Sequence, residues 1–146
     1  MRFTTIITVA AASFSGLSSA IISGFSVPAT IKPGTEGFNF RINTANYIQS
    51  VYDVAVAIGV APGKGFPGAL GQVTDSFYLG PEKSNILQPI NHWSYLPITL
   101  QKGTNVTLTA TFYSLFGAAA APTLTSWNVT VAIGDTTSST YVTTKP

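Results

Sequence analysis

Cysteine is absent from the 146-residue sequence, and histidine occurs only once, as His92. The chain therefore has no disulfides, although many small secreted domains depend on them. It also lacks the set of Cys and His ligands from which zinc sites are built. A single domain of this length can bury about two thirds of its surface without such support. We expect no metal site and no cofactor.

Charged residues are scarce too, at 8% of the chain, and the seven basic and five acidic side chains are scattered along it. Domains that bind nucleic acid concentrate Lys and Arg on one face, and no such cluster exists here. We therefore expect no nucleic acid partner. After residue 20 no apolar run approaches the roughly 20 residues that span a membrane, so we also expect no membrane span.

Catalytic motifs are missing as well. Asp53, Asp75 and Glu82 could meet as the paired carboxyl groups of a hydrolase, about 5–9.5 Å apart, but nothing in the sequence requires it, and we favour solvated acids in turns. No G-x-S-x-G elbow supports a serine triad around His92, which we expect in a loop or at a strand end. The Gly-rich segment 63–71 has no following helix to hold a phosphate. We predict that the protein is not an enzyme.

The first 20 residues have the pattern of a secretory signal peptide. Arg2 supplies the positive charge, residues 3–17 are largely apolar, and Ser18 to Ala20 are small, which places cleavage between Ala20 and Ile21. A membrane anchor is the weaker interpretation because the run is short and interrupted. Residues 21–146 then form one secreted domain, whose end from about residue 136 is rich in Ser and Thr. A copper monooxygenase, which needs an amino-terminal histidine, is excluded by a mature chain that starts at Ile21.

Residues 104–133 carry the clearest structural pattern, two long strands joined by a small-residue connection. Apolar and polar residues alternate with a period of two, as in half-buried antiparallel strands. The predicted inward residues are Val106, Leu108, Ala110 and Phe112, followed by Trp127, Val129, Val131 and Ile133. Each outward face carries an N-x-T triplet, at Asn105 and Asn128, and N-glycosylation requires such an exposed position.

Similar alternation elsewhere predicts about seven short strands separated by Gly and Pro, with no helix. In the strand expected over residues 52–60, Tyr52 and Val54 share a face with Val56, Ile58 and Val60. Seven strands in a chain of this size favour an immunoglobulin-like antiparallel β-sandwich. A jelly roll is the alternative.

Two features are candidates for binding a partner. Phe66 and Pro67 lie in the Gly-rich loop 63–71, where an exposed aromatic ring would anchor a partner unless it folds back onto the sandwich. Trp93 and Tyr95 share one strand face and could form a platform that stacks on sugars. The competing interpretation places this tryptophan in the core.

Several phrases occur together in order: ISGFSVPATIKPG (22–34), NYIQSVYDVAVAIG (46–59), FPGALG (66–71), SFYLGPEKSN (76–85) and PTLTSWNVTVAIGD (122–135). The sequence resembles the necrosis-inducing secreted protein family of filamentous fungi, which are small effectors. The resemblance covers most of the mature chain, and none of the phrases is a catalytic motif.

The resemblance implies a secreted virulence protein that provokes plant cell death. It also implies suppression of pattern-triggered immunity through binding of host immune receptor-like and receptor-associated kinases, without chemistry on the effector. Because kinase domains lie in the host cytoplasm, delivery into the host cell would follow secretion. We expect the contact surface to comprise the loop 63–71 and the turn 78–85, because both are irregular. The candidate contacts are Lys64, Phe66, Pro67, Tyr78, Glu82 and Lys83.

Two other functions fit the same sequence. A secreted module that binds cell-wall polysaccharide would use Trp93 and Tyr95. A purely structural wall protein would need only the two glycan sites and the Ser/Thr-rich end.

Overall fold

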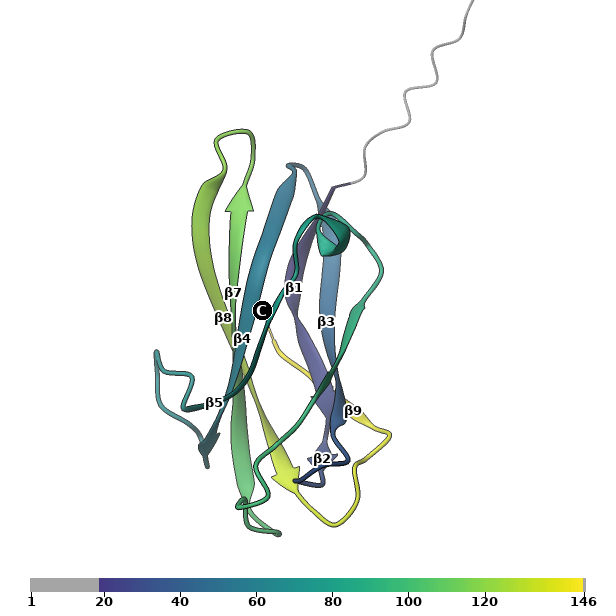
Figure 1. Ribbon diagram of the computed structural model, residues 1–146, viewed down its shortest axis with the longest axis vertical. Coiled ribbons are helices and arrows are strands. Elements are labelled where there is room, and N and C mark those ends of the chain that lie inside the picture. The colour runs from purple at the N-terminus through teal and green to yellow at the C-terminus, as the bar shows by residue number, and fades with distance from the viewer. Residues whose placement is uncertain (1–18, 146) are drawn as a thin grey trace, which may run out of the picture.

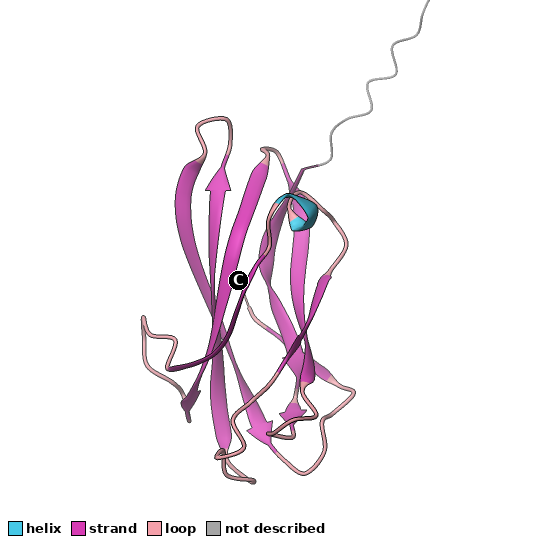
Figure 2. Ribbon diagram, viewed as in Figure 1, coloured by secondary structure: helices cyan, strands magenta, loops and turns pink. Residues whose placement is uncertain are grey.

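Two β-sheets pack face to face in the computed structural model (Figure 1), which describes residues 19–145. The predicted leader, apart from Ser19 and Ala20, lies outside the described residues. Within them there is one 3₁₀ turn and no α-helix (Figure 2). The elements in chain order are β1 (Ser19–Pro28), β2 (Thr30–Ile31), β3 (Phe38–Tyr47), β4 (Val51–Pro62), β5 (Gln72–Tyr78), η1 (Pro81–Lys83), β6 (Ile90–Ser94), β7 (Asn105–Phe116), β8 (Ala121–Ile133) and β9 (Tyr141–Thr143).

The strands form a four-stranded sheet in the order β6-β3-β1-β9 and a five-stranded sheet in the order β2-β8-β7-β4-β5. All neighbours are antiparallel except β2, which runs parallel to β8. The all-β class and an arrangement in two largely antiparallel sheets are therefore confirmed. The described strands outnumber the expected seven by β2 and β9, with two and three residues. Strand β2 is too short to show alternation, and β9 lies in the Ser/Thr-rich end, for which the sequence predicts an edge strand or a loose tail. Immunoglobulin-like connectivity stays a prediction.

One apolar core lies between the sheets. In the four-stranded sheet Phe25 stacks on Phe40 with ring centroids 4.7 Å apart, and both side chains are fully buried. In the five-stranded sheet Phe112 meets the ring of Trp127 edge-on at 5.4 Å. The inward residues predicted for the first strand of the 104–133 stretch are confirmed, since all of them are buried: Val106, Leu108, Ala110 and Phe112.

Strand β4 departs from its prediction because of one extra residue. A β-bulge between Asp53 and Ala55 shifts the register of β4 against β7, and an extra residue reverses the alternation of side chains from that point. The expectation that Tyr52 and Val54 share the core face is therefore wrong, and the Asp53 side chain points inward instead. The inward residues of β4 are Val51, Asp53, Val56, Ile58 and Val60.

The predicted cleavage site falls within β1. Ala20 is buried and pairs with Asn46, while Ile21 pairs with Ala45. Cleavage between Ala20 and Ile21 would shorten β1 by its first two residues and leave the rest of its ladder with β3 intact.

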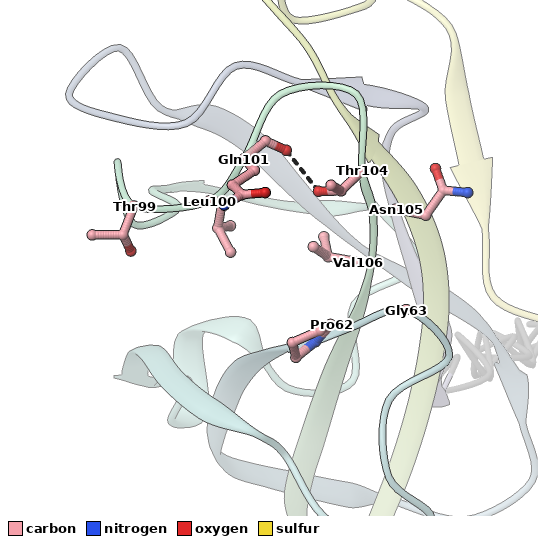
Figure 3. Close-up of a pocket in the computed structure, with 8 residues that line it drawn as sticks. All are labelled: Pro62, Gly63, Thr99, Leu100, Gln101, Thr104, Asn105 and Val106. Carbon is pink, nitrogen blue, oxygen red and sulfur yellow. Dashed lines mark hydrogen bonds between the residues drawn. The ribbon is translucent and has the colours of Figure 1, made fainter.

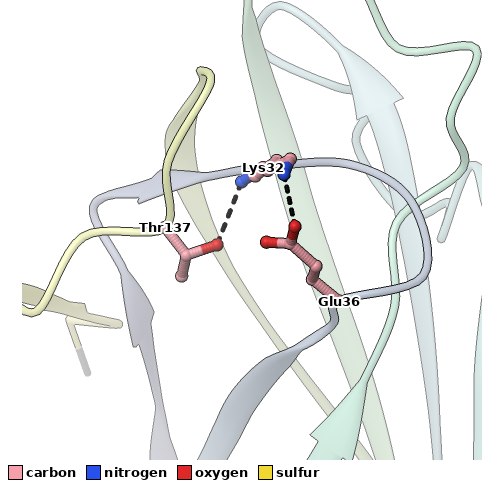
Figure 4. Close-up of polar contacts among 3 residues, drawn as sticks. All are labelled: Lys32, Glu36 and Thr137. Carbon is pink, nitrogen blue, oxygen red and sulfur yellow. Dashed lines mark hydrogen bonds and ion pairs between the residues drawn. The ribbon is translucent and has the colours of Figure 1, made fainter.

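The Ser/Thr-rich C-terminal segment is part of the sandwich. Strand β9 pairs with β1 as an edge strand. Thr144, which follows β9, forms two hydrogen bonds with Phe25 of β1. The N–H of Phe25 donates to Thr144 Oγ1 at 3.0 Å, and the N–H of Thr144 donates to the carbonyl of Phe25 at 2.9 Å. Earlier in the segment, the N–H of Lys32 donates to Thr137 Oγ1 at 3.1 Å, while Lys32 Nζ pairs with Glu36 (Figure 4). These bonds fix the end of the chain against both sheets.

Replacing Phe40 with Ala tests the core. The variant loses the stacking partner of Phe25 and leaves a cavity, so the free energy of unfolding should fall by about 3–5 kcal/mol in chemical denaturation. The matched control is Ile48→Ala at a side chain that is 93% exposed, which should change it by less than about 0.5 kcal/mol. Equal effects of the two variants would contradict the core assignment.

Candidate interaction surface

A row of large side chains crosses the outer face of the five-stranded sheet. Ala55 of β4 pairs with Tyr78 of β5 on one side and with Tyr113 of β7 on the other, and Tyr113 pairs with Leu124 of β8. Directly paired residues of adjacent strands point to the same side of a sheet. Tyr78 is 61% exposed and Leu124 71% exposed, so this row faces solvent.

Tyr52 joins the row from the neighbouring position on β4. Its hydroxyl lies 2.5 Å from the hydroxyl of Tyr78. This hydrogen bond, with a smaller contribution from desolvation, raises the pKa of Tyr52 above its ordinary value, so the Tyr52 phenol is neutral at physiological pH. We call the set Tyr52, Ala55, Tyr78, Tyr113 and Leu124 the tyrosine face.

The rows next to the tyrosine face carry no charged residue and consist mostly of small side chains. The first consists of Ser76, Ala57, Thr111 and Ser126, and the second of Val73, Gly59, Thr109 and Asn128. The Thr111 and Ser126 hydroxyls hydrogen-bond to each other at 2.6 Å. A partner on this sheet would therefore bind through apolar contact and hydroxyl groups, with little direct contribution from charge.

The loop 63–71 lies against the same outer face. A Cβ atom on Gly59 would lie 2.3 Å from the carbonyl oxygen of Leu70, so only glycine permits this approach. Within the loop, Lys64, Phe66 and Pro67 are exposed, and Phe66 retains 66% of its surface. With this much of its surface exposed, Phe66 does not fold back onto the sandwich, so that alternative is wrong.

The structure divides the predicted contact surface into two parts. The loop with Lys64, Phe66 and Pro67 precedes β5, and the turn with Glu82 and Lys83 follows it, so the two lie at opposite ends of that seven-residue strand (Figure 1). Glu82 is exposed, whereas the Lys83 ammonium lies 5.7 Å from the centroid of the Phe77 ring.

Tyr78 belongs instead with three residues that the sequence analysis did not select: Tyr52, Tyr113 and Leu124. Alternation alone places Tyr113 outward. The bulge in β4 and the register between strands are needed to bring the four together.

Both predicted glycosylation sites face solvent on this sheet. Asn105 and Asn128 are exposed, as alternation predicted. The threonine of the first site, Thr107, is buried and its hydroxyl donates to the carbonyl of Gly63 at 2.7 Å. Thr107 also lies opposite Thr130, the threonine of the second site, with their hydroxyl oxygens 3.3 Å apart.

The acidic residues and the histidine have structural contacts. His92 Nε2 lies 2.9 Å from Asp75 Oδ2, and its ring stacks on Phe77. These contacts join β5 to β6 at one side of the sandwich. His92 lies in the middle of β6 and pairs with Phe40 of β3, so the expected loop or strand-end position of His92 is wrong. Ser114 donates to Asp53 Oδ1 at 2.6 Å. Over residues 19–145 no group of three or more His, Cys, Asp or Glu side chains is placed to hold a metal ion, and no helix there is long and apolar enough to cross a membrane.

A hollow of about 410 Å³ lies beside the first glycosylation site (Figure 3). Leu100, Val106 and Pro62 supply its apolar walls, and Thr104 donates to the carbonyl of Gln101 at 2.6 Å at its rim. Figure 3 shows Asn105 pointing to the side of β7 away from Val106. No set of polar groups converges in this hollow.

Trp93 and Tyr95 lie on the other sheet, at and just beyond β6. They are 55% and 49% exposed, so the interpretation that buries Trp93 in the core is wrong. The indole N–H donates to the carbonyl of Glu36 at 3.2 Å, which holds the ring against the surface near Gly37. An exposed aromatic pair is therefore present, as a sugar-binding platform would require.

A sequence model of the Nis1 family matches residues 18–132, which span the chain from β1 almost to the end of β8. The chain belongs to the Nis1 family. It is 46% identical to necrosis-inducing secreted protein 1 of Colletotrichum orbiculare over 97% of this chain and 86% of the relative. Identity to necrosis-inducing secreted protein 1 of Colletotrichum higginsianum is 45%, over 97% of each chain. These matches confirm the resemblance and show a secreted protein of this effector family.

Buried Asp53 gives stability a specific pH dependence. Burial raises the pKa of its carboxyl, and the hydrogen bond from Ser114 offsets part of this. Between the ordinary and the raised pKa the folded chain binds more protons than the unfolded one, so the Asp53 contribution to stability falls as pH rises through that window. Asp53→Asn should therefore gain stability relative to the wild type as pH rises from 3 to 7. Denaturation at both pH values measures this, and a difference that is independent of pH would contradict it.

Proposed function

We propose that this chain is a secreted fungal effector that binds host plant immune receptor-associated kinases, suppresses pattern-triggered immunity and induces host cell death. The family match and the two similar proteins support an effector. The observation that carries the binding mechanism is the tyrosine face, an open sheet surface with exposed aromatic rings.

Tyrosine side chains suit a protein partner for physical reasons. Each offers a large apolar ring and a hydroxyl but loses the freedom of only two torsions on binding, and tyrosine is enriched at interface positions that dominate affinity. Here the rings stand on strands of a five-stranded sheet, and the bond between the Tyr52 and Tyr78 hydroxyls restricts two of them. Such preorganisation reduces the entropy lost on association.

Inhibition would be stoichiometric. The bound effector would block access to the kinase or its activating contacts, with affinity governed by how slowly the complex dissociates. The kinase domain lies in the host cytoplasm, so this proposal includes delivery into the host cell after secretion.

We also propose that the strands follow immunoglobulin-like connectivity. Strands β1, β3 and β6 share one sheet, and β4, β7 and β8 share the other. This partition corresponds to the A, B, E and C, F, G strands of immunoglobulin domains, with β5 added beside β4. The parallel pairing of β2 with β8 supports the same scheme. Strand β2 directly follows β1 in the chain, so the two together act as one first strand that contributes to both sheets.

The kinase proposal is tested by expressing residues 21–146 inside leaf cells and measuring the oxidative burst triggered by a microbial elicitor. We expect the wild type to suppress the burst. A Tyr78→Thr/Tyr113→Thr variant should lose suppression and bind the captured kinase at least about tenfold more weakly, since interface tyrosines often contribute 2 kcal/mol or more each. Threonine keeps the strand preference of both positions.

The matched control is Tyr95→Thr, an exposed tyrosine on the other sheet, which should suppress like the wild type. Phe66→Ala in the same assay reports separately on the loop. A normal burst despite accumulation of the wild type would count against the effector mechanism. Full suppression by the double variant would remove the tyrosine face from the interface.

Binding of cell-wall polysaccharide is the second candidate, and the exposed pair Trp93 and Tyr95 favours it. Sedimentation with insoluble chitin, β-glucan or cellulose measures it directly. If this function holds, the wild type and the Tyr78→Thr/Tyr113→Thr variant should both be depleted from the supernatant. Trp93→Ala should remain in solution. Retention of the wild type in the supernatant with all three polymers would exclude this candidate.

A further inference from the structure

We propose that Asn128 carries an N-linked glycan whose first N-acetylglucosamine packs into a groove of the protein itself, against Phe66. The groove has a volume of about 500 Å³ and lies between the loop 63–71 and the outer face of β7 and β8. Its lining residues are Phe66, Gly68, Ala69, Leu70, Thr109, Thr111, Leu124, Ser126 and Asn128. The acceptor side chain is thus one of the walls.

Strand register explains how the acceptor reaches the loop. Asn128 pairs with Thr109, and Thr109 pairs with Gly59, so the three lie in one row across the outer face. The carbonyl oxygen of Leu70 lies where a side chain on Gly59 would be. The loop therefore covers the β4 end of this row, and Asn128 stands at the β8 end.

The loop is fixed before any sugar arrives. The N–H of Gly63 donates to the carbonyl of Asn105 at 3.0 Å, and the N–H of Ala69 donates to the carbonyl of Phe66 at 3.1 Å. The Thr107 hydroxyl, on strand β7 of the sheet beneath the loop, donates to the carbonyl of Gly63. Phe66 is consequently presented on an anchored loop.

The chemistry of the groove matches a sugar ring. Phe66, Leu70 and Leu124 give it apolar surface, while the hydroxyl groups of Thr109, Thr111 and Ser126 give it hydrogen-bonding surface. A pyranose ring likewise has apolar C–H faces and a rim of polar groups. No charged residue lines the groove, which suits a neutral N-acetylglucosamine. The covered apolar surface of Phe66 and Leu124 would add to stability in proportion to its area.

The modification itself uses the secretory pathway and the sequence Asn128-Val129-Thr130. The amide nitrogen of Asn128 forms a bond to C1 of the first sugar of a lipid-pyrophosphate-linked oligosaccharide. That nitrogen loses one proton, and the lipid pyrophosphate leaves from C1.

Asn105 provides a matched contrast. It stands on the same sheet and belongs to the same kind of triplet, but its side chain points away from the hollow bounded by Val106 and Leu100 (Figure 3). A glycan there would meet no comparable apolar wall. The change Asn105→Gln removes this site and leaves Thr107, which anchors the loop, in place.

The test measures melting temperatures of protein secreted from yeast, with site occupancy determined by mass spectrometry. Asn128→Gln should lower the melting temperature by about 3–5 °C, whereas Asn105→Gln should leave it within about 1 °C. Trimming the glycans enzymatically to one N-acetylglucosamine per site should preserve the wild-type value. In a Phe66→Ala background, Asn128→Gln should cause no further loss.

Unglycosylated protein from bacteria controls for the substitution itself, and there Asn128→Gln should have no effect. An unmodified Asn128 in the secreted protein would overturn the proposal. So would an effect of Asn128→Gln that persists in the Phe66→Ala background. Kinase interference is assayed with unglycosylated protein in leaf cells, so either proposal can fail without the other.

Discussion

The pairing of β4 with β7 is the constraint on which the outer surface depends. Twelve-residue strands lie side by side at the centre of the five-stranded sheet, and each residue of β4 must point either into the core or into solvent. The bulge at Asp53 and Ala55 changes that assignment once along the strand. As a result a carboxyl group is buried beside Ser114, and Tyr52 is placed outside, within reach of the Tyr78 hydroxyl.

Much of this fold could be predicted from the sequence because alternation is a local property. The inward positions from Val106 to Phe112, the outward positions of Asn105 and Asn128 and the irregular loop 63–71 all follow from residue order. The bulge could not be predicted, because residues 51–60 are apolar at almost every position and an extra residue there does not visibly break the alternation. Strand β2 escaped for a related reason, because two residues do not establish a period.

The candidate surface was harder to predict than the fold. Tyr78 could be selected as exposed, but its neighbours Tyr113 and Leu124 come from strands far away in sequence, and only the register aligns them. The outer face of this sheet therefore has two regions, the tyrosine face at one end and the groove beside Asn128 at the other. Leu124 lies at the boundary, since it belongs to the tyrosine face and also lines the groove beside Asn128, four residues or about 13 Å along β8. A partner on the tyrosine face would therefore approach beside any carbohydrate carried there.

The bonds between Phe25 and Thr144 have a consequence for the order of events during synthesis. They join positions 119 residues apart, so the backbone of the first strand finds its last partners only when almost the whole chain has left the ribosome. Contacts of such long range are also slow to form. Until then, β1 exposes the edge that β9 later covers, and an uncovered edge invites pairing with other chains. The nascent protein would thus spend its passage into the secretory compartment incomplete, and a chaperone that shields this edge would have its greatest effect in that interval.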